Sequence, residues 1–306
     1  MPDPTDWFVV VNPASGAGRA GRRWPALARA LSAAGVRYEA TVTARPGHAT
    51  GLVGDALRRG YRRVLAVGGD GVLHEVLNGV MGQDDVAPSA VCLGAAPLGS
   101  GNDWARAQRI PMDAAGTARC VAAGRAVLQD VGRLDFPLAG AGERSCHFIN
   151  VAGAGLDGYV LERLPRRVPR RIAYLVGVLR SLATFRPPMV DLDADGSRRN
   201  ERLLLALVAL GPYCGGGMRL APMASTDDGA FDLLTVRPLR LPGELVKLRR
   251  LFDGRLPEES FARYARVQEA RITADPPAIV QADGQIVGRT PCVATLLPRA
   301  ILTLRG

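Results

Sequence analysis

Residues 63–71 read Arg-Val-Leu-Ala-Val-Gly-Gly-Asp-Gly, a short apolar run that ends in a glycine-rich turn. Helical spacing follows, with Val72, Val76 and Val80 on one face. A helix that begins at such a turn offers free N–H groups and a favourable dipole to an anion. The stretch therefore predicts a βα unit with an anion site at its turn.

The same pattern occurs twice more in the first 110 residues. Residues 7–11 lead into Asn-Pro-Ala-Ser-Gly-Ala-Gly at 12–18, and residues 90–96 lead into Pro-Leu-Gly-Ser-Gly-Asn at 97–102. In a parallel sheet these turns share the carboxyl edge, where open α/β sheets bind ligands. Asp70 suits a site in which a divalent cation lies between carboxylate and phosphate. The alternative is a tight turn with an N-cap aspartate.

After about residue 130 the pattern changes to short β-like segments separated by turn residues. We predict an α/β domain over residues 1–130, to which residues 295–306 could return, and a β-sandwich domain over residues 131–294. The β-like segments are residues 146–152, 203–210, 231–236, 270–274 and 279–287.

The charge of the chain is strongly positive and almost entirely due to arginine. The formal net charge is +10 over 306 residues, which favours polyanionic partners such as nucleotides or an anionic bilayer. Lys247 is the only lysine. Walker-type loops, protein-kinase sites and Schiff-base chemistry each need a suitably placed lysine, so these classes are disfavoured.

The five cysteines form no C-x-x-C pair, so neither a disulfide framework nor a zinc site is indicated. The N-terminus lacks signal-peptide features, and the longest apolar run, residues 203–210, is far shorter than the roughly 20 residues of a membrane span. We expect a cytoplasmic protein that associates with membranes peripherally.

Four ordered motifs together resemble the soluble diacylglycerol kinase family, which includes sphingosine and ceramide kinases. The resemblance covers essentially the whole chain. It implies a nucleotide-binding α/β domain, a C-terminal β-sandwich, and transfer of the γ-phosphoryl group of ATP, with Mg²⁺, to a hydroxyl of diacylglycerol or a related lipid. The motifs are residues 10–16, residues 68–71 with Glu75 and Asn78-Gly79, residues 97–103, and residues 282–284.

The resemblance also implies roles for individual residues. Asp70, Asp103 and Asp130 would hold the catalytic Mg²⁺ and its waters. A structural Mg²⁺ would bind the Ser225 and Ala230 carbonyls and the Asp228 carboxylate, although a turn aspartate explains Asp228 equally well. The nucleotide contacts would be Asn12, Pro13, Ala14, Ser15, Gly16, Thr43, Gly68, Gly69, Asp70, Gly71, Val72, Leu73, His74 and Ser100.

The chain departs from the family pattern at two positions. The family's proton acceptor is assigned to an Asp-Gly-Glu motif, which here reads Asp283-Gly284-Gln285, so only Asp283 can ionise. Asp283 could accept or orient the hydroxyl proton, but Asp-Gly between apolar runs is also a strong hairpin signal. Val72 replaces the usual threonine after Gly-Gly-Asp-Gly. Asp283 and Gln285 are the candidate catalytic pair.

An arginine cluster at residues 163–171 precedes a segment of helical spacing at residues 172–185. Basic residues beside an amphipathic helix suit an anionic membrane surface that presents the lipid substrate. No nucleic-acid-binding signature accompanies the charge. The sequence does not determine the oligomeric state, and a homodimer is one of the states that it allows. The cluster comprises Arg163, Arg166, Arg167, Arg170 and Arg171.

Three alternatives remain. An NAD kinase would share the glycine-aspartate turn, and Val72 and Gln285 leave room for a binding protein without turnover. A dehydrogenase would rest on G-x-G-x-x-G at residues 16–21 with Glu39 as the ribose-binding acid.

Residues 191–196 begin like an EF-hand calcium-binding loop. Position twelve of such a loop is Arg202 here, so we predict a hairpin there.

Overall fold

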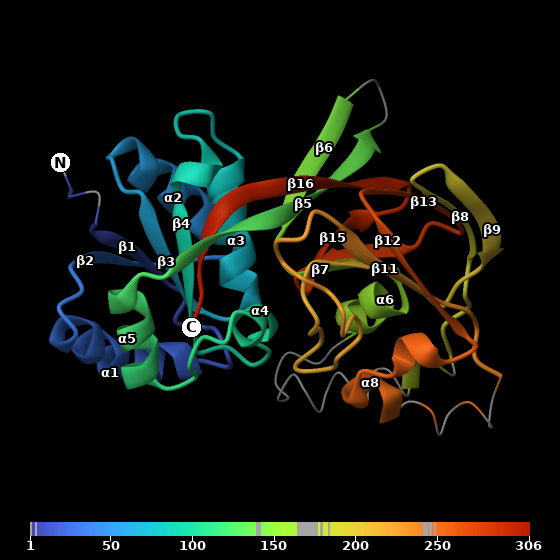
Figure 1. Cartoon of the computed structure of the whole chain (residues 1–306), viewed down its shortest axis with the longest axis horizontal. Helices are drawn as coiled ribbons and strands as arrows, with labels where there is room; N and C mark the ends of the chain where they lie inside the picture. Colours follow the sequence, from blue (N-terminus) through green and yellow to red (C-terminus); the bar gives the residue numbers. More distant parts are fainter. Residues whose placement is uncertain are drawn as a thin grey trace. The chain divides into compact units, whose positions relative to one another are not determined.

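The computed structural model describes residues 2–3, 5–138, 142–163, 177, 180–182, 184–240, 244, 247 and 249–306. The chain forms two compact units (Figure 1). Unit 1 comprises residues 1–129 and 299–306, and unit 2 comprises residues 130–298. Two long strands contribute residues to both units, β5 (Ala126–Leu138) and β16 (Cys292–Leu304).

Unit 1 is built on a parallel sheet with the order β2, β1, β3, β4, and Leu302 and Thr303 of β16 pair with β4. β1, β3 and β4 are almost wholly buried, as expected for parallel strands covered on both faces. The strands are β1 (Trp7–Val11), β2 (Tyr38–Val42), β3 (Arg63–Gly68) and β4 (Cys92–Pro97).

The helices of unit 1 pack in two pairs, α1 with α5 and α2 with α3. Leu27 and Leu31 of α1 and Val121 of α5 share one core with Val9 and Val11 of the sheet. The predicted α/β class is confirmed. The helices are α1 (Arg19–Ala33), α2 (His48–Arg58), α3 (Asp70–Met81), η1 (Pro88–Ala90), α4 (Asp103–Ala107) and α5 (Ala114–Ala123).

Unit 2 contains the predicted β-sandwich. One antiparallel sheet has the order β12, β11, β10, β7, β14, β15. In the facing sheet the N-terminal part of β16 pairs with β13, which is followed by β8 and β9. Leu192 and Ile272 of one sheet share a core with Val208, Leu233 and Val280 of the other. The strands are β6 (Gly142–Phe148), β7 (Val151–Gly155), β8 (Met189–Ala194), β9 (Ser197–Arg202), β10 (Leu205–Ala209), β11 (Phe231–Val236), β12 (Ala262–Val267), β13 (Glu269–Asp275), β14 (Ile279–Ala282) and β15 (Gln285–Arg289).

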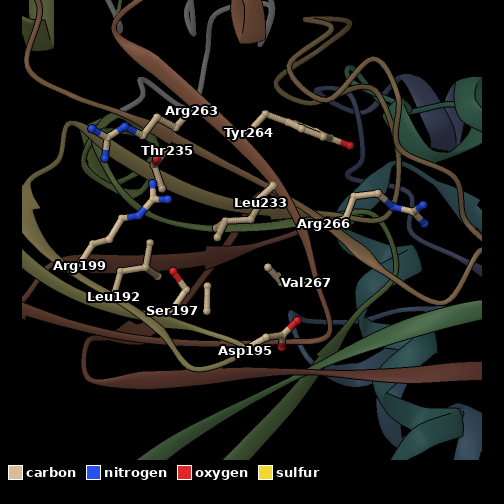
Figure 2. Close-up of a pocket in the computed structure, with 12 residues that line it drawn as sticks. Leu192, Asp195, Ser197, Arg199, Leu233, Thr235, Arg263, Tyr264, Arg266 and Val267 are labelled. Carbon is tan, nitrogen blue, oxygen red and sulfur yellow. The ribbon is translucent and has the colours of Figure 1, made fainter.

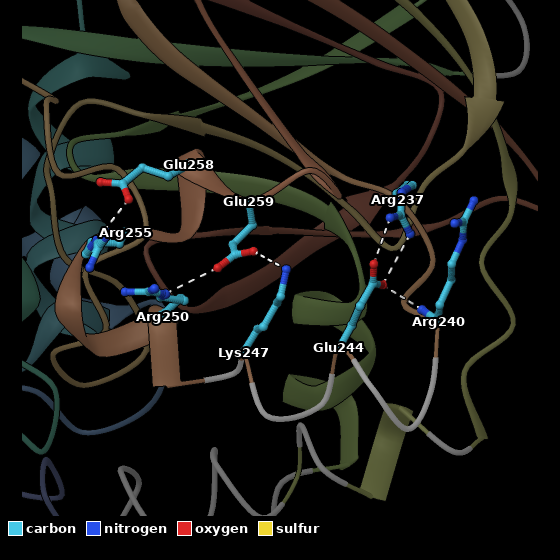
Figure 3. Close-up of polar contacts among 8 residues, drawn as sticks. All are labelled: Arg237, Arg240, Glu244, Lys247, Arg250, Arg255, Glu258 and Glu259. Carbon is cyan, nitrogen blue, oxygen red and sulfur yellow. Dashed lines mark hydrogen bonds and ion pairs between the residues drawn. The ribbon is translucent and has the colours of Figure 1, made fainter.

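A second cluster of unit 2 packs α6 (Leu156–Arg163) and η3 (Leu256–Glu258) against the six-stranded sheet. Next to them, α8 (Arg250–Asp253) takes part in a group of ion pairs (Figure 3). In this group the Lys247 ammonium lies 2.6 Å from a carboxylate oxygen of Glu259, which also pairs with Arg250. The only lysine of the chain therefore has a structural partner.

Both predicted hairpins are confirmed. Asp195 and Gly196 join β8 to β9, and Asp283 and Gly284 join β14 to β15. The first residue of each turn has φ of +48° and the second has φ of +83° or +75°. Positive φ at both central positions is typical of a type I′ hairpin turn, which explains the Asp-Gly sequence at each site.

The single strand predicted over residues 146–152 is wrong. The chain forms β6 and β7 with a break at Ile149 and Asn150. The backbone N–H groups at the break donate to the Asp283 carboxylate instead of to a neighbouring strand. A local apolar pattern cannot reveal this, because the acceptor lies in another part of the chain.

Among the described residues, no helix is both long and apolar enough to cross a membrane. The predicted helix at residues 172–185 lies largely outside the described residues. So do Arg166, Arg167, Arg170 and Arg171 of the arginine cluster. Its remaining member, Arg163, lies 3.5 Å from the ring centroid of Tyr159 and pairs with Glu162.

Candidate active site

Two of the glycine turns of unit 1 touch each other. The N–H of Gly99 donates to the Gly68 carbonyl at 2.6 Å, and a Cβ on Gly99 would collide with the Cα of Gly69. Glycine is required at position 99, and at position 69 an added Cβ would lie 3.1 Å from the Cα of Gly99, which leaves little room for a side chain there too. The turns after β3 and β4 therefore form one continuous backbone surface.

Asp70 fixes the geometry of the two turns. Its Oδ2 accepts the N–H of Asn102 at 2.8 Å, and its Oδ1 accepts the N–H of Asp103 at 3.0 Å. The Asp70 carboxylate thereby caps the first turn of α4, although 32 residues separate it from Asn102. The N-cap role that the sequence left open is thus present, but it serves α4 and not the helix that Asp70 begins.

Asp103 brings a second carboxylate to the same place. A Cβ on Gly101 would lie 2.7 Å from Asp70 Oδ2 and 3.5 Å from Asp103 Oδ2, so both carboxylates border this glycine. Within the described residues, no three His, Cys, Asp or Glu side chains form a metal-binding group. In phosphoryl-transfer sites Mg²⁺ binds one or two carboxylates together with water and substrate phosphate. The carboxylates of Asp70 and Asp103 fit this ligand set, in which the protein does not enclose the ion completely.

The first turn is joined to the other two by Ser15 and Arg19. Ser15 Oγ lies against Gly68, where an added Cβ would approach it to 2.7 Å. The Arg19 guanidinium donates to the carbonyls of Leu98 and Gly99. Arg19 was not among the predicted site residues. Its position in the first turn of the helix after the glycines was the available signal.

The other predicted nucleotide contacts lie around these turns. Asn12 Oδ1 accepts the N–H of Ala14 at 3.1 Å and shapes the first turn. Thr43 follows β2, and its N–H donates to the carbonyl of Val11, the last residue of β1. The Val72, Leu73 and His74 side chains are buried, so a ligand at this part of α3 would contact backbone atoms rather than side chains. Pro13, Gly16 and Ser100 lie in the turns themselves.

The arrangement gives no support to a dehydrogenase. Glu39, the expected ribose-binding acid, accepts hydrogen bonds from Arg59 Nη1 and from the Tyr61 hydroxyl, both at 2.8 Å. These contacts lower the pKa of Glu39, chiefly through the Arg59 guanidinium. Gly21 packs against Pro13, where an added Cβ would lie 3.2 Å from the proline. The third glycine therefore serves helix packing.

In unit 2, Asp283 is a buried acceptor. Its Oδ1 accepts the N–H groups of Asn150 at 3.0 Å and Val151 at 3.2 Å, and its Oδ2 accepts the N–H of Ile149 at 3.1 Å. The side chain thereby holds the break between β6 and β7. Gln285 begins the next strand and is half-buried.

Asp157 is a second buried carboxyl group of unit 2, and the sequence reasoning missed it. Its oxygens accept the N–H of Gly158 at 2.8 Å and the Gln281 amide at 2.9 Å. Burial raises its pKa to about 6. The available signal was Gly-Ala-Gly-Leu-Asp-Gly at residues 153–158, a glycine-rich stretch that runs from the end of β7 into α6.

Two residues of the predicted second metal site, Asp228 and Ser225, form polar contacts with other side chains. Asp228 Oδ2 lies 2.5 Å from Arg266 Nη2, and Ser225 Oγ donates to Asp227 at 2.7 Å. Asp130 belongs to the same region, because its Oδ2 accepts the N–H of Gly229 at 2.8 Å. Ala230 directly precedes β11. Asp228 is therefore ion-paired with Arg266, and its role as a ligand of a structural Mg²⁺ stays a prediction.

An apolar pocket of about 290 Å³ lies beside α6 and the start of β14. Tyr159, Phe185 and Ile279 line it, with Arg186 and Arg289 also among its lining residues. Tyr159 and Phe185 pack edge to face, with their ring centroids 5.0 Å apart. The pocket therefore combines an apolar lining with cationic side chains.

Models of known protein families match the sequence of both units. Residues 6–134 match the diacylglycerol kinase catalytic domain, and residues 150–305 match the YegS C-terminal NAD kinase beta sandwich-like domain. A diacylglycerol kinase of Bacillus subtilis (strain 168) is 28% identical over 288 residues, which cover 92% of this chain and 90% of that protein.

Solved structures share the fold. A diacylglycerol kinase crystal structure from Bacillus anthracis str. Sterne superposes with a TM-score of 0.74 at 21% identity, covering 100% of this chain and 98% of that one. Yeast NADH kinase complexed with NADH gives a TM-score of 0.53 at 10% identity, covering 99% and 84%. With both domain models matched in order over nearly its whole length, the chain belongs to the family of diacylglycerol kinase-like lipid kinases.

Proposed function

We propose that this kinase transfers the γ-phosphoryl group of ATP, with Mg²⁺, to a hydroxyl of diacylglycerol or a closely related lipid. The observation that carries the proposal is the junction of the turns after β3 and β4. There Asp70 binds the backbone of Asn102 and Asp103, and Gly69 meets Gly99. This junction supplies N–H groups and two carboxylates, and phosphoryl transfer needs little beyond positioning and charge neutralisation.

In this proposal the three turns bind the nucleotide phosphates through backbone N–H groups, and Asp70 and Asp103 hold Mg²⁺ with its waters. When bound, the metal ion neutralises charge on the transferred phosphoryl group. Because Asp70 also binds the backbone at the start of α4, its own carboxylate and that of Asp103 both stay next to Gly101. Arg19 holds the Leu98–Gly99 backbone in place and adds a positive charge near the turns.

Unit 2 contains the residue that would meet the lipid hydroxyl. Asp283 is the family-like candidate, but its oxygens already accept three backbone N–H groups, which suits orienting a hydroxyl more than accepting its proton. Asp157 is buried, its oxygens are held by Gly158 and Gln281, and it does not line the apolar pocket, so its raised pKa bears on stability and not on the transfer. The apolar pocket beside α6 would take part of the acyl chain.

We further propose that the lipid is presented at an anionic membrane surface. The formal net charge of +10 supports this, because exposed arginines near anionic lipids contribute roughly 1 kcal/mol each. This attraction weakens with salt, since exposed charges are screened over about 8 Å at physiological ionic strength.

The test is an incubation of the full chain with γ-labelled ATP, Mg²⁺ and mixed micelles of diacylglycerol, with NAD in a parallel tube. Label in the organic phase that disappears without Mg²⁺ supports the proposal. Label in NAD would instead support the NAD kinase alternative. Binding of ATP with no label in either product would show a binding protein without turnover.

A further inference from the structure

Unit 2 contains a pocket that the proposed reaction does not use. It has a volume of about 190 Å³ and lies where β9 and β12, the edge strands of the two sheets, approach each other (Figure 2). Its apolar lining includes Leu192, Leu233 and Val267, all members of the sandwich core.

Two arginines enter this pocket from inward-facing positions of opposite sheets. Arg199 lies opposite Leu192 in the β8–β9 pair, and Arg263 lies opposite Thr235 in the β11–β12 pair. Directly opposed residues of antiparallel strands point to the same face of a sheet. Figure 2 shows the two guanidinium groups on the same side of the pocket as the Thr235 hydroxyl, whereas Arg266 points away from them.

Three arginines and one aspartate line the pocket, and Arg266 is paired with Asp228. Arg263 is paired with Glu201 at 3.0 Å. The Asp195 carboxylate, which also lines the pocket, accepts the backbone N–H groups of Gln268 and Glu269. No carboxylate of the described residues lies within ion-pair distance of Arg199. The Arg199 guanidinium therefore has no ion pair within the described part of the chain, and an anion between it and Arg263 would gain charge-assisted hydrogen bonds from both.

We propose that this pocket binds a phosphomonoester, held by the Arg199 and Arg263 guanidinium groups and the Thr235 hydroxyl. Guanidinium groups bind phosphate oxygens through paired, charge-assisted hydrogen bonds. The Thr235 side chain is 5% exposed, so its hydroxyl is held in place by the sheet around it. The apolar lining next to these groups accommodates carbon atoms bonded to the phosphate. The source of the phosphate is either a lipid headgroup or a small soluble ester.

Binding is best followed by methyl NMR of the full chain, because the glycine turns of unit 1 offer a second place for phosphate. The reporters are the methyl groups of Leu192, Leu233 and Val267. The titrants are inorganic phosphate, glycerol 3-phosphate and short-chain dihexanoyl phosphatidate. We expect the reporters to shift in a saturable way and to respond less at higher salt. Tighter binding of the phosphatidate than of glycerol 3-phosphate would identify a lipid headgroup as the ligand, and equal binding would identify a soluble ester.

Arg199→Gln should weaken the response about tenfold or more, and Thr235→Val should weaken it as well. Arg198→Gln is the matched control, because Arg198 precedes Arg199 in β9 and its guanidinium pairs with Asp193 outside the pocket lining. It should leave the titration unchanged. Inward-facing charges can also simply protect a sheet edge from pairing with another chain. Reporters that do not move at millimolar titrant, or that respond equally in Arg199→Gln and Arg198→Gln, would overturn the proposal in favour of that role.

Discussion

The Asp283 carboxylate accepts the backbone N–H of Asn150 at 3.0 Å, although 133 residues separate the two along the chain. Together with Ile149 and Val151, this contact ends β6 and begins β7. The residue proposed to meet the lipid hydroxyl is therefore also a structural residue of the sandwich. Variants at this position have to be analysed for stability and activity separately.

Asp283→Asn should lower the free energy of unfolding by about 1–3 kcal/mol, because the amide of asparagine would point a donor at one of three backbone N–H groups. The turn itself tolerates asparagine, so it adds no cost. Chemical denaturation measures the stability. Turnover per folded molecule should also fall by about 10²-fold if Asp283 orients the hydroxyl. Unchanged turnover per folded molecule would leave Asp283 with the structural role alone.

Gln285→Glu should raise lipid phosphorylation, because it restores the second carboxylate of the Asp-Gly-Glu pattern beside Asp283. Gln285 is half-buried at the start of β15, so the charge retains access to water and the fold should be unaffected. Steady-state kinetics with diacylglycerol micelles provide the measurement, and Gln285→Ala is the control. If the glutamate variant is no faster than wild type, the single carboxylate does not limit this protein.

The parts of the fold that follow from local chemistry could be predicted from the sequence. Apolar runs that end in glycine turns gave the βα units. The Asp-Gly pairs at 195–196 and 283–284 gave the two hairpins, since their φ values require such residues. The β-sandwich followed from short β-like segments separated by turn residues.

The features that depend on distant contacts could not be predicted. The break at residues 149–150 depends on Asp283, and the cap of α4 depends on Asp70. The burial of Asp157 depends on the strand that carries Gln281. In each case one side chain satisfies backbone or amide groups that are remote in sequence, and periodicity contains no information about such pairs.

Asp157 should make stability depend on pH in a defined direction. Burial raises its pKa from 3.8 to about 6, so the folded state binds a proton more tightly than the unfolded state between these values. Its contribution to stability is therefore present below about pH 4 and is lost as the pH rises through about 6. The total change is about 3 kcal/mol.

Asp157→Asn removes this titration. Because Asp232 also has a pKa raised to about 6, by burial and the nearby Asp228 carboxylate, the difference between wild type and variant is the informative quantity. Denaturation at pH 4 and pH 8 should show the variant gaining stability relative to wild type at the higher pH. A difference that stays constant with pH would rule out the shifted pKa of Asp157.

Gln129 should be essential for the support of α4. Its Oε1 accepts hydrogen bonds from the Trp104 indole at 3.2 Å, the Gln108 amide at 2.9 Å and the Thr303 hydroxyl at 3.2 Å. Gln129→Met keeps the approximate volume but leaves three buried donors without this acceptor. We expect a loss of at least about 2 kcal/mol in denaturation experiments. A loss of only a few tenths would mean that water replaces the acceptor.

Asp70→Asn should nearly abolish phosphoryl transfer, because it removes one of the two carboxylates at Gly101 and places an amide donor against the backbone N–H groups at the start of α4. The lost cap should cost about 0.5–2 kcal/mol. A matched control separates these effects. Asp113 caps α5 by accepting the N–H of Gly116 at 2.7 Å, and it lies outside the glycine turns. Asp113→Ala, which removes this cap, should lose comparable stability yet retain turnover per folded molecule. If the two variants lose stability equally and both keep their activity, Asp70 is only a helix cap and the proposed metal pair has to be abandoned.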